Sequence, residues 1–303
     1  MISKPPPKPT LFLYGAMAKP NVMTIVRNQC IPEETENIEK ILTGWQRAAT
    51  LFRKIEESEK GVADNNFPIN IEPNPKLLEI QNDPLFRYGF SIYPSEFKIV
   101  EIDNLVAPQR NVSLSYVEEL TKRIPKNPTM DNLIDICLST KQKVPTPQSW
   151  QNAPNVFTFS SPSVDFRFLG GFPKPLTNDD LQFCLGGGQP IGAIILFYGY
   201  GTGSINVLQA NNRLILNNGF HRVYTLRKLG ITKIPVVVQK IGNPDLEMQP
   251  QILGLTKEYL LKHERPVLVK DFFVEDLTTI LRLKNTIRTV QIQWGDIPND
   301  TAV

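Results

Sequence analysis

Seven consecutive residues, Leu216-Asn217-Asn218-Gly219-Phe220-His221-Arg222, combine side-chain types that bind anions. Either asparagine can cap a following helix by accepting a backbone N–H, and Gly219 leaves room for a ligand to approach the main chain. The first N–H groups of a helix carry partial positive charge and form a ready anion site. His221 can donate a hydrogen bond or a proton, and Arg222 offers a planar fork that matches phosphate oxygens. The segment therefore predicts a phosphate-binding turn.

The charge distribution favours the same chemistry. The chain has 33 basic and 30 acidic residues, a formal net charge of +3, but no carboxylate lies between Asp180 and Asp245. A long carboxylate-free window that holds several fixed cations predicts a positive potential that attracts anions. Buried strands, which need no charge, are the alternative explanation of this window. Its cations are Arg213, Arg222, Arg227, Lys228, Lys233 and Lys240.

Catalysis at such a turn would need groups from elsewhere in the chain. Phosphoryl transfer requires charge neutralisation, usually by Mg²⁺, and a group that orients the nucleophile. Because residues 181–244 lack carboxylates, we expect these groups outside the window, with His221 as the catalytic residue inside it. Asp103, at the end of a predicted strand, is the first candidate, and a structural role is its alternative. Glu118 is the second candidate, although Ser115-x-x-Glu118 also reads as a capping box. Lower-ranking carboxylates are Asp165, Asp179 and Asp180.

Other patterns are weaker. Gly199–Ser204 is glycine-rich but lacks the lysine and the following helix of a phosphate loop, so it predicts a flexible hairpin connection. His263-Glu264-Arg265 precedes a proline and predicts a helix end rather than a site. With three widely spaced cysteines and two histidines, neither a disulfide framework nor a closed zinc site is expected.

Composition limits the class of protein. The chain has 303 residues, 41% of them hydrophobic, which suffices for a sizeable core. Its 26 prolines exceed the roughly 15 expected at average usage and predict many stiff loops. The longest apolar run, around Ile191 to Tyr198, is too short to span a bilayer. The N-terminus lacks a secretory h-region. We therefore expect a cytoplasmic protein without a membrane partner.

The elements that would position the turn form a strand, turn, helix and strand. We expect strands at Ile191–Tyr198 (buried), Ile205–Gln209 and Arg213–Leu216, then a helix over Gly219–Leu229 that Gly230 ends. The apolar strand Ile234–Val238 follows. Further upstream, the sequence predicts a strand from Phe97 to Asp103, a helix from Glu33 to about Lys60, and a hairpin of Val156–Phe159 with Val164–Phe168.

These elements predict an α+β or α/β fold, a mixed sheet with packed helices. The chain is expected to divide into a flexible Pro-rich arm (1–30), a helical N-terminal region with an irregular bridge (31–95), a mixed-sheet domain with an insertion at about 125–185 (96–245), and a C-terminal helical extension (246–303).

The aromatic residues of this insertion could stack on nucleic-acid bases, but their alternation along the sequence favours a sheet core.

The mixed-sheet region resembles the ParB/sulfiredoxin superfamily. The resemblance is carried by Gln189-Pro190-Ile191, by Asn218–Gly230 and by Ile234–Val238, with Val100–Leu105 similar to the opening strand, and it spans about residues 97–241. In that family the corresponding turn binds nucleotide phosphates, those of ATP in sulfiredoxin and the free-serine kinase and of CTP in the partition proteins. The resemblance implies that Gly219, His221 and Arg222 bind phosphate, together with Asn218 and Phe220.

Two departures from the family's pattern limit which of its activities we expect from this chain. Sulfiredoxin has its nucleophilic cysteine where this chain has Phe220, so sulfinic-acid reduction is not expected. Partition proteins have a glutamate where His221 stands and a helix-turn-helix region after it. The leading hypothesis is a nucleoside triphosphate-binding protein that hydrolyses ATP or CTP, or transfers a phosphoryl group, with Mg²⁺. The alternatives are a non-enzymatic DNA- or RNA-binding or regulatory module and a degenerate member that serves as an interaction scaffold.

Overall fold

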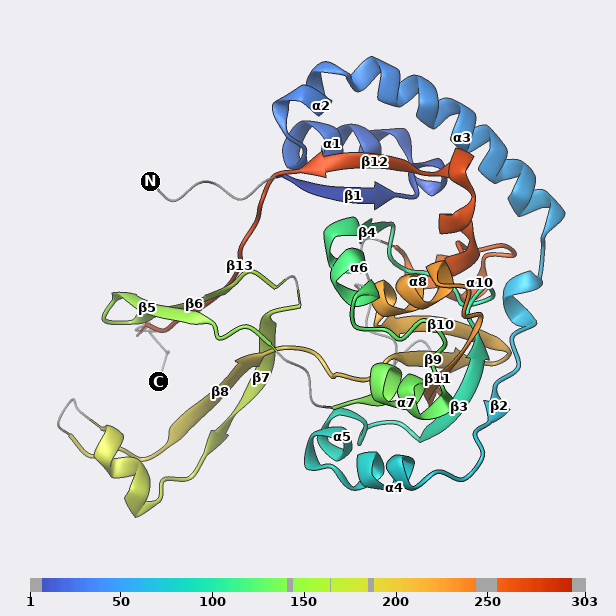
Figure 1. Cartoon of the computed structure of the whole chain (residues 1–303). Helices are drawn as coiled ribbons and strands as arrows, with labels where there is room; N and C mark the ends of the chain where they lie inside the picture. The colour runs from blue at the N-terminus through green and yellow to red at the C-terminus, as the bar shows by residue number, and fades with distance from the viewer. Residues whose placement is uncertain (1–6, 141–143, 164, 185–187, 244–254, 296–303) are drawn as a thin grey trace, which may run out of the picture. The chain divides into compact units, whose positions relative to one another are not determined.

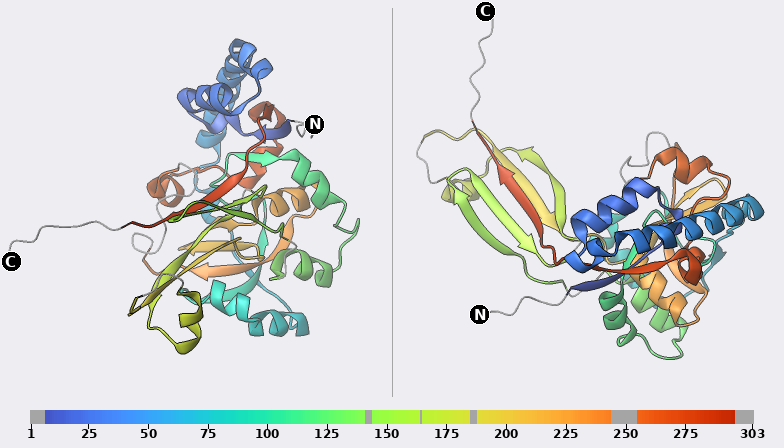
Figure 2. Two further views of the ribbon diagram at one scale, coloured as in Figure 1. Left: turned by 90° about the vertical axis from the view of Figure 1, so that its left-hand side faces the viewer. Right: turned by 90° about the horizontal axis from the view of Figure 1, so that it is seen from above.

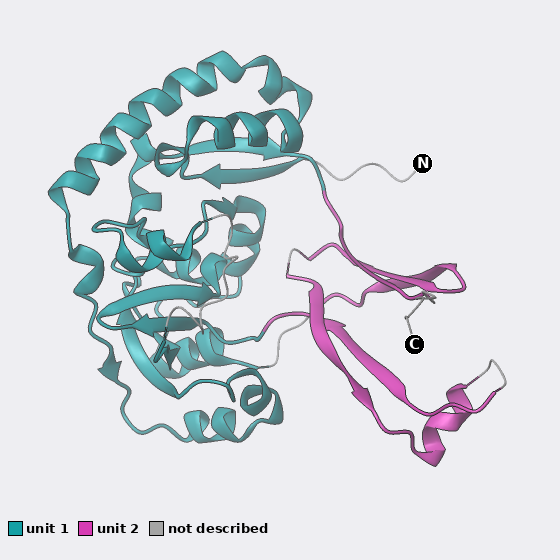
Figure 3. Ribbon diagram, turned by 180° about the vertical axis from the view of Figure 1, so that it is seen from behind, with its two compact units in different colours: residues 1–142, 202–285 teal, residues 143–201, 286–303 magenta. Residues whose placement is uncertain are grey.

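The structure is a computed structural model that describes residues 7–140, 144–163, 165–184, 188–243 and 255–295. The chain forms two compact units, which Figure 3 shows in different colours. Unit 1 contains residues 1–142 and 202–285, and unit 2 contains residues 143–201 and 286–303. Helices and several sheets are present together (Figure 1), so the expected α+β class is confirmed.

The main sheet of unit 1 is mixed and has the strand order β10-β9-β11-β3-β2. β9 and β10 form an antiparallel hairpin, β11 runs parallel to β9, and β3 runs antiparallel to β11. β2 pairs with only two residues of β3. The strands are β2 (Ile69–Asn70), β3 (Ser95–Glu101), β9 (Asn206–Ala210), β10 (Arg213–Asn218) and β11 (Lys233–Lys240).

Helix α8 (Phe220–Lys228) connects β10 to β11, as the sequence predicts. Its buried residues include Phe220, Val223 and Leu226, which belong to the same apolar cluster as the buried residues of the main sheet. Gly230, at φ 85°, ends the helix in the left-handed conformation that glycine adopts without strain. The strand, turn, helix and strand around the candidate site are therefore confirmed.

A second sheet of unit 1 joins the two ends of the chain. β1 (Lys8–Phe12) lies between β4 (Asn111–Ser113) and β12 (Thr279–Leu283). The helices α1 (Lys19–Gln29) and α3 (Ile38–Ser58) pack near this sheet through a shared apolar cluster (Figure 2), and α2 (Pro32–Glu36) lies between them in the chain. The expected arm over residues 1–30 is wrong from Lys8 onward, because β1 has a distant pairing partner; residues 1–6 lie outside the described residues.

The remaining helices of unit 1 are short. The proline-rich bridge contains two of them, each with a proline in its first turn and a side-chain cap, from Asn74 and Asp83. The expected capping box at Ser115 is wrong, because Ser113 is the N-cap of α6 and makes no side-chain cap bond. The helices are α4 (Pro75–Asn82), α5 (Pro84–Gly89), α6 (Leu114–Thr121), α7 (Met130–Leu138) and α10 (Lys257–Lys262).

The C-terminal region is not the helical extension that the sequence predicts. Among its described residues, α10 is followed by two 3-10 helices, η4 (Val269–Phe273) and η5 (Glu275–Leu277), and then by the strands β12 and β13 (Arg288–Gln293). β12 pairs with β1 and β13 pairs with β6, about 270 and 130 residues away in the chain. The strand pairings of β12 and β13 outweigh the helical preference that the local pattern of the C-terminal region predicts. No helix among the described residues has the length and apolarity needed to cross a membrane.

Unit 2 is built from strands and contains most of the predicted insertion. Its boundaries differ from the expected 125–185, since α7 belongs to unit 1 and the last strand of the chain joins unit 2. One sheet has the order β13-β6-β5, with β6 in the middle, and the other is a ribbon of β7 and β8. The strands are β5 (Gln148–Ala153), β6 (Val156–Ser161), β7 (Arg167–Lys174) and β8 (Ala193–Gly199), and η3 (Asn178–Phe183) lies between the last two.

Two expectations within unit 2 are wrong. The predicted hairpin of Val156–Phe159 with Val164–Phe168 does not form, because β6 pairs with β5 and β13 while β7 pairs with β8. The strand predicted at Ile191–Tyr198 does form as β8, but it is largely exposed rather than buried. Its apolar run does not reflect a core position, since the ribbon has only two strands in the described residues.

Candidate functional site

One side of the turn between β10 and α8 is occupied by the chain itself. Gly219 has φ 91°, a left-handed conformation that favours glycine. A Cβ at this position would lie 2.6 Å from Cγ1 and 3.2 Å from Cα of Ile205, the residue just before β9. The space that the sequence assigns to a ligand is thus occupied on this side by Ile205. Gly219 is required by backbone conformation and internal packing.

Asn218 does not cap α8. Its Nδ2 donates to the carbonyl oxygens of Thr202 (2.7 Å) and Ser204 (2.9 Å), and α8 has no side-chain cap. The side chain therefore holds residues 202–204, the segment that leads into β9. The expected capping role is wrong because Gly219, which has no side chain, is the N-cap residue of α8.

The Arg222 guanidinium is directed to main-chain carbonyls. Its Nη1 donates to the oxygen of Ile136 in α7, at 3.1 Å, and to the oxygen of Gly203. These contacts join α8 to two segments that are far apart in sequence. Nη1 of the predicted phosphate-facing fork is thus engaged by protein oxygens, and phosphate binding by Arg222 stays a prediction.

His221 is a neutral hydrogen-bond acceptor. Its Nε2 accepts from the backbone N–H of Ser113 at 3.1 Å, and its ring meets the ring of Tyr116 edge-on at 5.3 Å. Burial lowers the pKa of His221 to about 4. At pH 7 the imidazole is therefore uncharged, with Nε2 unprotonated. The structure places it as a link between α8 and the start of α6 through Nε2, and Nδ1, which carries the proton of the neutral ring, is its hydrogen-bond donor.

Asp103, the first candidate carboxylate, lies away from the turn. Asp103 forms a two-point ion pair with Arg227, at 2.5 and 3.0 Å, in the last turn of α8. Arg227 follows Phe220 by seven residues, which corresponds to about 10 Å along the helix. Asp103 thus meets the opposite end of α8. Glu118 is exposed on α6, and the lower-ranking carboxylates belong to unit 2.

Three of the six cations of the carboxylate-free window pair with acids from outside it. Arg213, which is 4% exposed, forms a two-point ion pair with Asp64. Lys240 pairs with Glu96 at 2.5 Å, and Arg227 pairs with Asp103 as described. Lys228 and Lys233 are exposed. The strong positive potential expected from the sequence is reduced, since the partners come from distant segments that a window of sequence does not contain.

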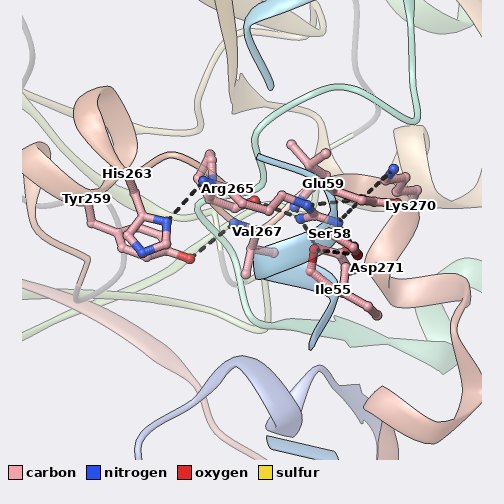
Figure 4. A network of polar contacts seen from close by, with 11 residues as sticks. Ile55, Ser58, Glu59, Tyr259, His263, Arg265, Val267, Lys270 and Asp271 are labelled. Atoms are coloured by element: carbon pink, nitrogen blue, oxygen red, sulfur yellow. Dashed lines mark hydrogen bonds and ion pairs between the residues drawn. The ribbon is translucent and has the colours of Figure 1, made fainter. Parts of the chain in front are cut away.

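A buried ionic network was missed by the sequence analysis, which assigned His263–Arg265 to a helix end. Arg265 is 1% exposed and donates to both carboxylate oxygens of Asp271, at 2.8 and 2.6 Å, and to Glu59 at the end of α3 (Figure 4). Lys270 also contacts Glu59, at 2.8 Å. The network joins α3 to the segment before β12. No local pattern could reveal it, because Glu59 is 206 residues from Arg265.

The aromatic residues of unit 2 divide into two groups. Phe166 is 2% exposed and packs near Tyr200, as expected for a sheet core. The aromatic side chains of the β7–β8 ribbon (residues 167–174 and 193–199) are different, because they remain 40–49% exposed. Aromatic residues are enriched at protein interfaces. The ribbon's exposed aromatics are Phe168, Phe172, Phe197 and Tyr198.

Among the described residues, no group of three or more His, Cys, Asp or Glu side chains is placed to hold a metal ion. No family model matches the sequence, and no curated protein or solved structure is significantly similar to it.

Proposed function

We propose that this chain is a binding protein with a ParB/sulfiredoxin-like core, in which the inserted unit 2 carries the interaction surface. The turn at residues 218–222 is then a structural node, that is, a group of side chains whose hydrogen bonds hold neighbouring segments of the chain together. One observation carries the proposal: the side chains of Asn218, His221 and Arg222 all bond to main-chain atoms of other segments. The mixed order of the main sheet and the helix between β10 and β11 support the resemblance.

The node holds both ends of the insertion. Arg222 bonds to Ile136, which precedes unit 2 in the chain, and to Gly203, which follows it. Two further bonds connect the same stretches: Ile205 N–H donates to the Cys137 oxygen at 2.6 Å, and the Ser204 hydroxyl donates to the Leu138 oxygen at 2.9 Å. The residues that the resemblance assigns to phosphate binding thus hold together the two segments that lead into and out of unit 2.

Unit 2 offers the exposed apolar surface that a binding protein needs. Soluble monomers rarely expose large contiguous apolar patches, and those that do use them for interaction. On the ribbon, Ile194 is 73% exposed in addition to the four aromatic side chains. A reducing compartment such as the cytoplasm fits this proposal, because Cys30, Cys137 and Cys184 are free thiols.

The test separates a structural node from a ligand site. We expect Arg222→Met to lower the free energy of unfolding by about 2–4 kcal/mol, since two hydrogen bonds from a charged donor are lost. We also expect calorimetry to detect no binding of ATP or CTP with Mg²⁺ to the unmodified chain. Lys228→Met, which removes an exposed cation from the same helix, is the control and should leave stability nearly unchanged. Nucleotide binding that Arg222→Met abolishes without loss of stability would refute the proposal.

A second candidate function is nucleotide binding by the main chain of α8. The helix begins without a side-chain cap, and its first internal bond runs from Val223 N–H to Gly219 oxygen. The amides of Phe220, His221 and Arg222 therefore precede the intrahelical bonds, and an ATP or CTP phosphate could accept from them. This candidate predicts binding in the same calorimetry, with hydrolysis or phosphoryl transfer if Mg²⁺ is recruited. Contact with DNA or RNA phosphates instead would weaken steeply with salt.

A further inference from the structure

We propose that strand β8 pairs antiparallel with β8 of a second copy of this chain, so that two β7–β8 ribbons form one four-stranded sheet. The inference rests on the proposed function, because it gives the interaction surface of unit 2 a partner. A two-stranded ribbon is only marginally stable by itself in water. Among the described residues, β8 pairs with β7 and with no other strand, so its other edge presents unpaired backbone groups.

The edge of β8 lacks the features that prevent strand pairing. Natural edge strands are protected by charges, prolines, bulges or short length. β8 has seven residues, Ala193-Ile194-Ile195-Leu196-Phe197-Tyr198-Gly199, without charge or proline. Such an edge is a template for another extended strand, and two identical neutral strands bring no like charges together.

β7 is protected in the ways that β8 is not. It contains Pro173, which cannot donate a backbone hydrogen bond, and its register shifts between Phe168 and Gly170. In the register that overlaps all eight residues, antiparallel self-pairing of β7 would also place Arg167 opposite Lys174, and like charges in directly opposite positions are destabilising. The contrast between the two strands of one ribbon selects β8 as the pairing edge.

The sequence of β8 is self-complementary in one register. A two-fold axis through Leu196, the central residue, places Ile194 of each copy opposite Tyr198 of the other, and Ile195 opposite Phe197. Pairs of an aromatic with a β-branched residue are among the favourable cross-strand pairs, worth about 0.2–1 kcal/mol each. The same register places four such pairs across the axis and fixes the alignment of the two strands.

The expected interface is small. Phe197 and Tyr198 are 43% and 40% exposed, so the four rings of two copies offer on the order of 350 Å² of aromatic surface. Leu196, 38% exposed, and Ile194 add to this area. Interfaces below about 1,200 Å² in total belong to weak, reversible complexes. We therefore expect a monomer–dimer equilibrium in the micromolar range.

The first experiment measures mass by sedimentation and light scattering of the full chain between about 1 and 200 µM. The mass should rise from 34.3 kDa toward twice that value. Leu196→Lys sets two lysines opposite each other at the axis and should keep the chain at 34.3 kDa. The control Phe172→Lys, on β7 and 48% exposed in the wild type, should associate like the wild type. A wild-type chain that stays monomeric throughout, or a Leu196→Lys chain that still associates, overturns the inference.

A second experiment keeps the test decisive if the lysine variant folds poorly. Opposite Cα atoms in antiparallel strands lie about 4.5–5.5 Å apart, within disulfide range. In a Cys184→Ser background, which removes the exposed native thiol, Leu196→Cys should form a covalent dimer under mild oxidation, whereas Phe172→Cys should not. Equal or absent cross-linking of the two variants contradicts β8 pairing. Either failure leaves the nucleotide calorimetry at residues 218–222 unaffected, so failure of this inference and failure of the proposed function are distinguishable.

Discussion

The protonation of His221 gives the sharpest test of how the 218–222 turn works. Its imidazole is neutral in the folded chain, with the pKa lowered by burial from 6.5 to about 4. Below pH 6.5 the unfolded chain takes up a proton on this residue, but the folded chain does so only near pH 4. The unfolded state therefore binds more protons in this window, and stability is lost as the pH falls from about 6.5 to about 4.

The magnitude follows from the size of the shift. One pKa unit corresponds to about 1.4 kcal/mol, so lowering the pKa from 6.5 to about 4 makes His221 responsible for about 3 kcal/mol of lost stability across the window. The loss should be complete near pH 4 and absent above pH 7. In the folded chain the bond in which Nε2 accepts from Ser113 N–H persists across this window and breaks only when Nε2 is protonated near pH 4.

The assay is urea unfolding at a series of pH values for the wild type and for His221→Gln. The glutamine side chain can accept the Ser113 N–H through Oε1 but does not titrate. The difference in unfolding free energy between the two proteins should change by about 3 kcal/mol from pH 7 to pH 4. The chain has only two histidines, so NMR titration can follow His221 directly, with the variant assigning its signals. Parallel pH profiles of the two proteins, or a His221 pKa near 6.5, would refute the reasoning.

Three substitutions test other contacts of unit 1, each by urea unfolding at neutral pH. Gly219→Ala should destabilise the fold by about 2 kcal/mol or more, since it combines a left-handed backbone with overlap against Ile205; a neutral effect would contradict the packing of the turn. Asp103→Asn should cost less than about 1 kcal/mol, because its ion pair with Arg227 is partly exposed, and a larger loss would indicate a role beyond that pair. Asp271→Ala should cost about 3–5 kcal/mol by leaving a buried guanidinium underpaired, and a loss below 1 kcal/mol would show that Glu59 alone suffices.

Local patterns predict the elements around the candidate site well. The helix over residues 220–228 follows from its apolar spacing and from the glycines on either side, and both glycines have positive φ. The long helix α3 follows in the same way from its three- and four-residue spacing. Such features depend on residues within one or two turns of each other, which a single sequence contains.

Local sequence patterns do not predict the elements whose pairing partner lies far away in the sequence. β1 and β12 pair across more than 260 residues, so neither the expected arm nor the expected helical extension survives. β8 has the composition of a buried strand, yet it lies in an exposed ribbon. An apolar run indicates that a segment buries its side chains against another segment. It does not indicate whether that segment belongs to the same chain.

Residue types and their spacing are enough to place a glycine turn, an asparagine, a histidine and an arginine at the start of one helix. What these groups bind depends on the segments that folding brings next to them. A guanidinium donates to a phosphate oxygen or to a main-chain carbonyl through the same N–H groups, and Arg222 donates to the carbonyls of Ile136 and Gly203 because the fold brings them there. Asp103 likewise meets Arg227, 124 residues away. Residue type sets the chemistry that is available, and proximity in the folded chain selects the partner.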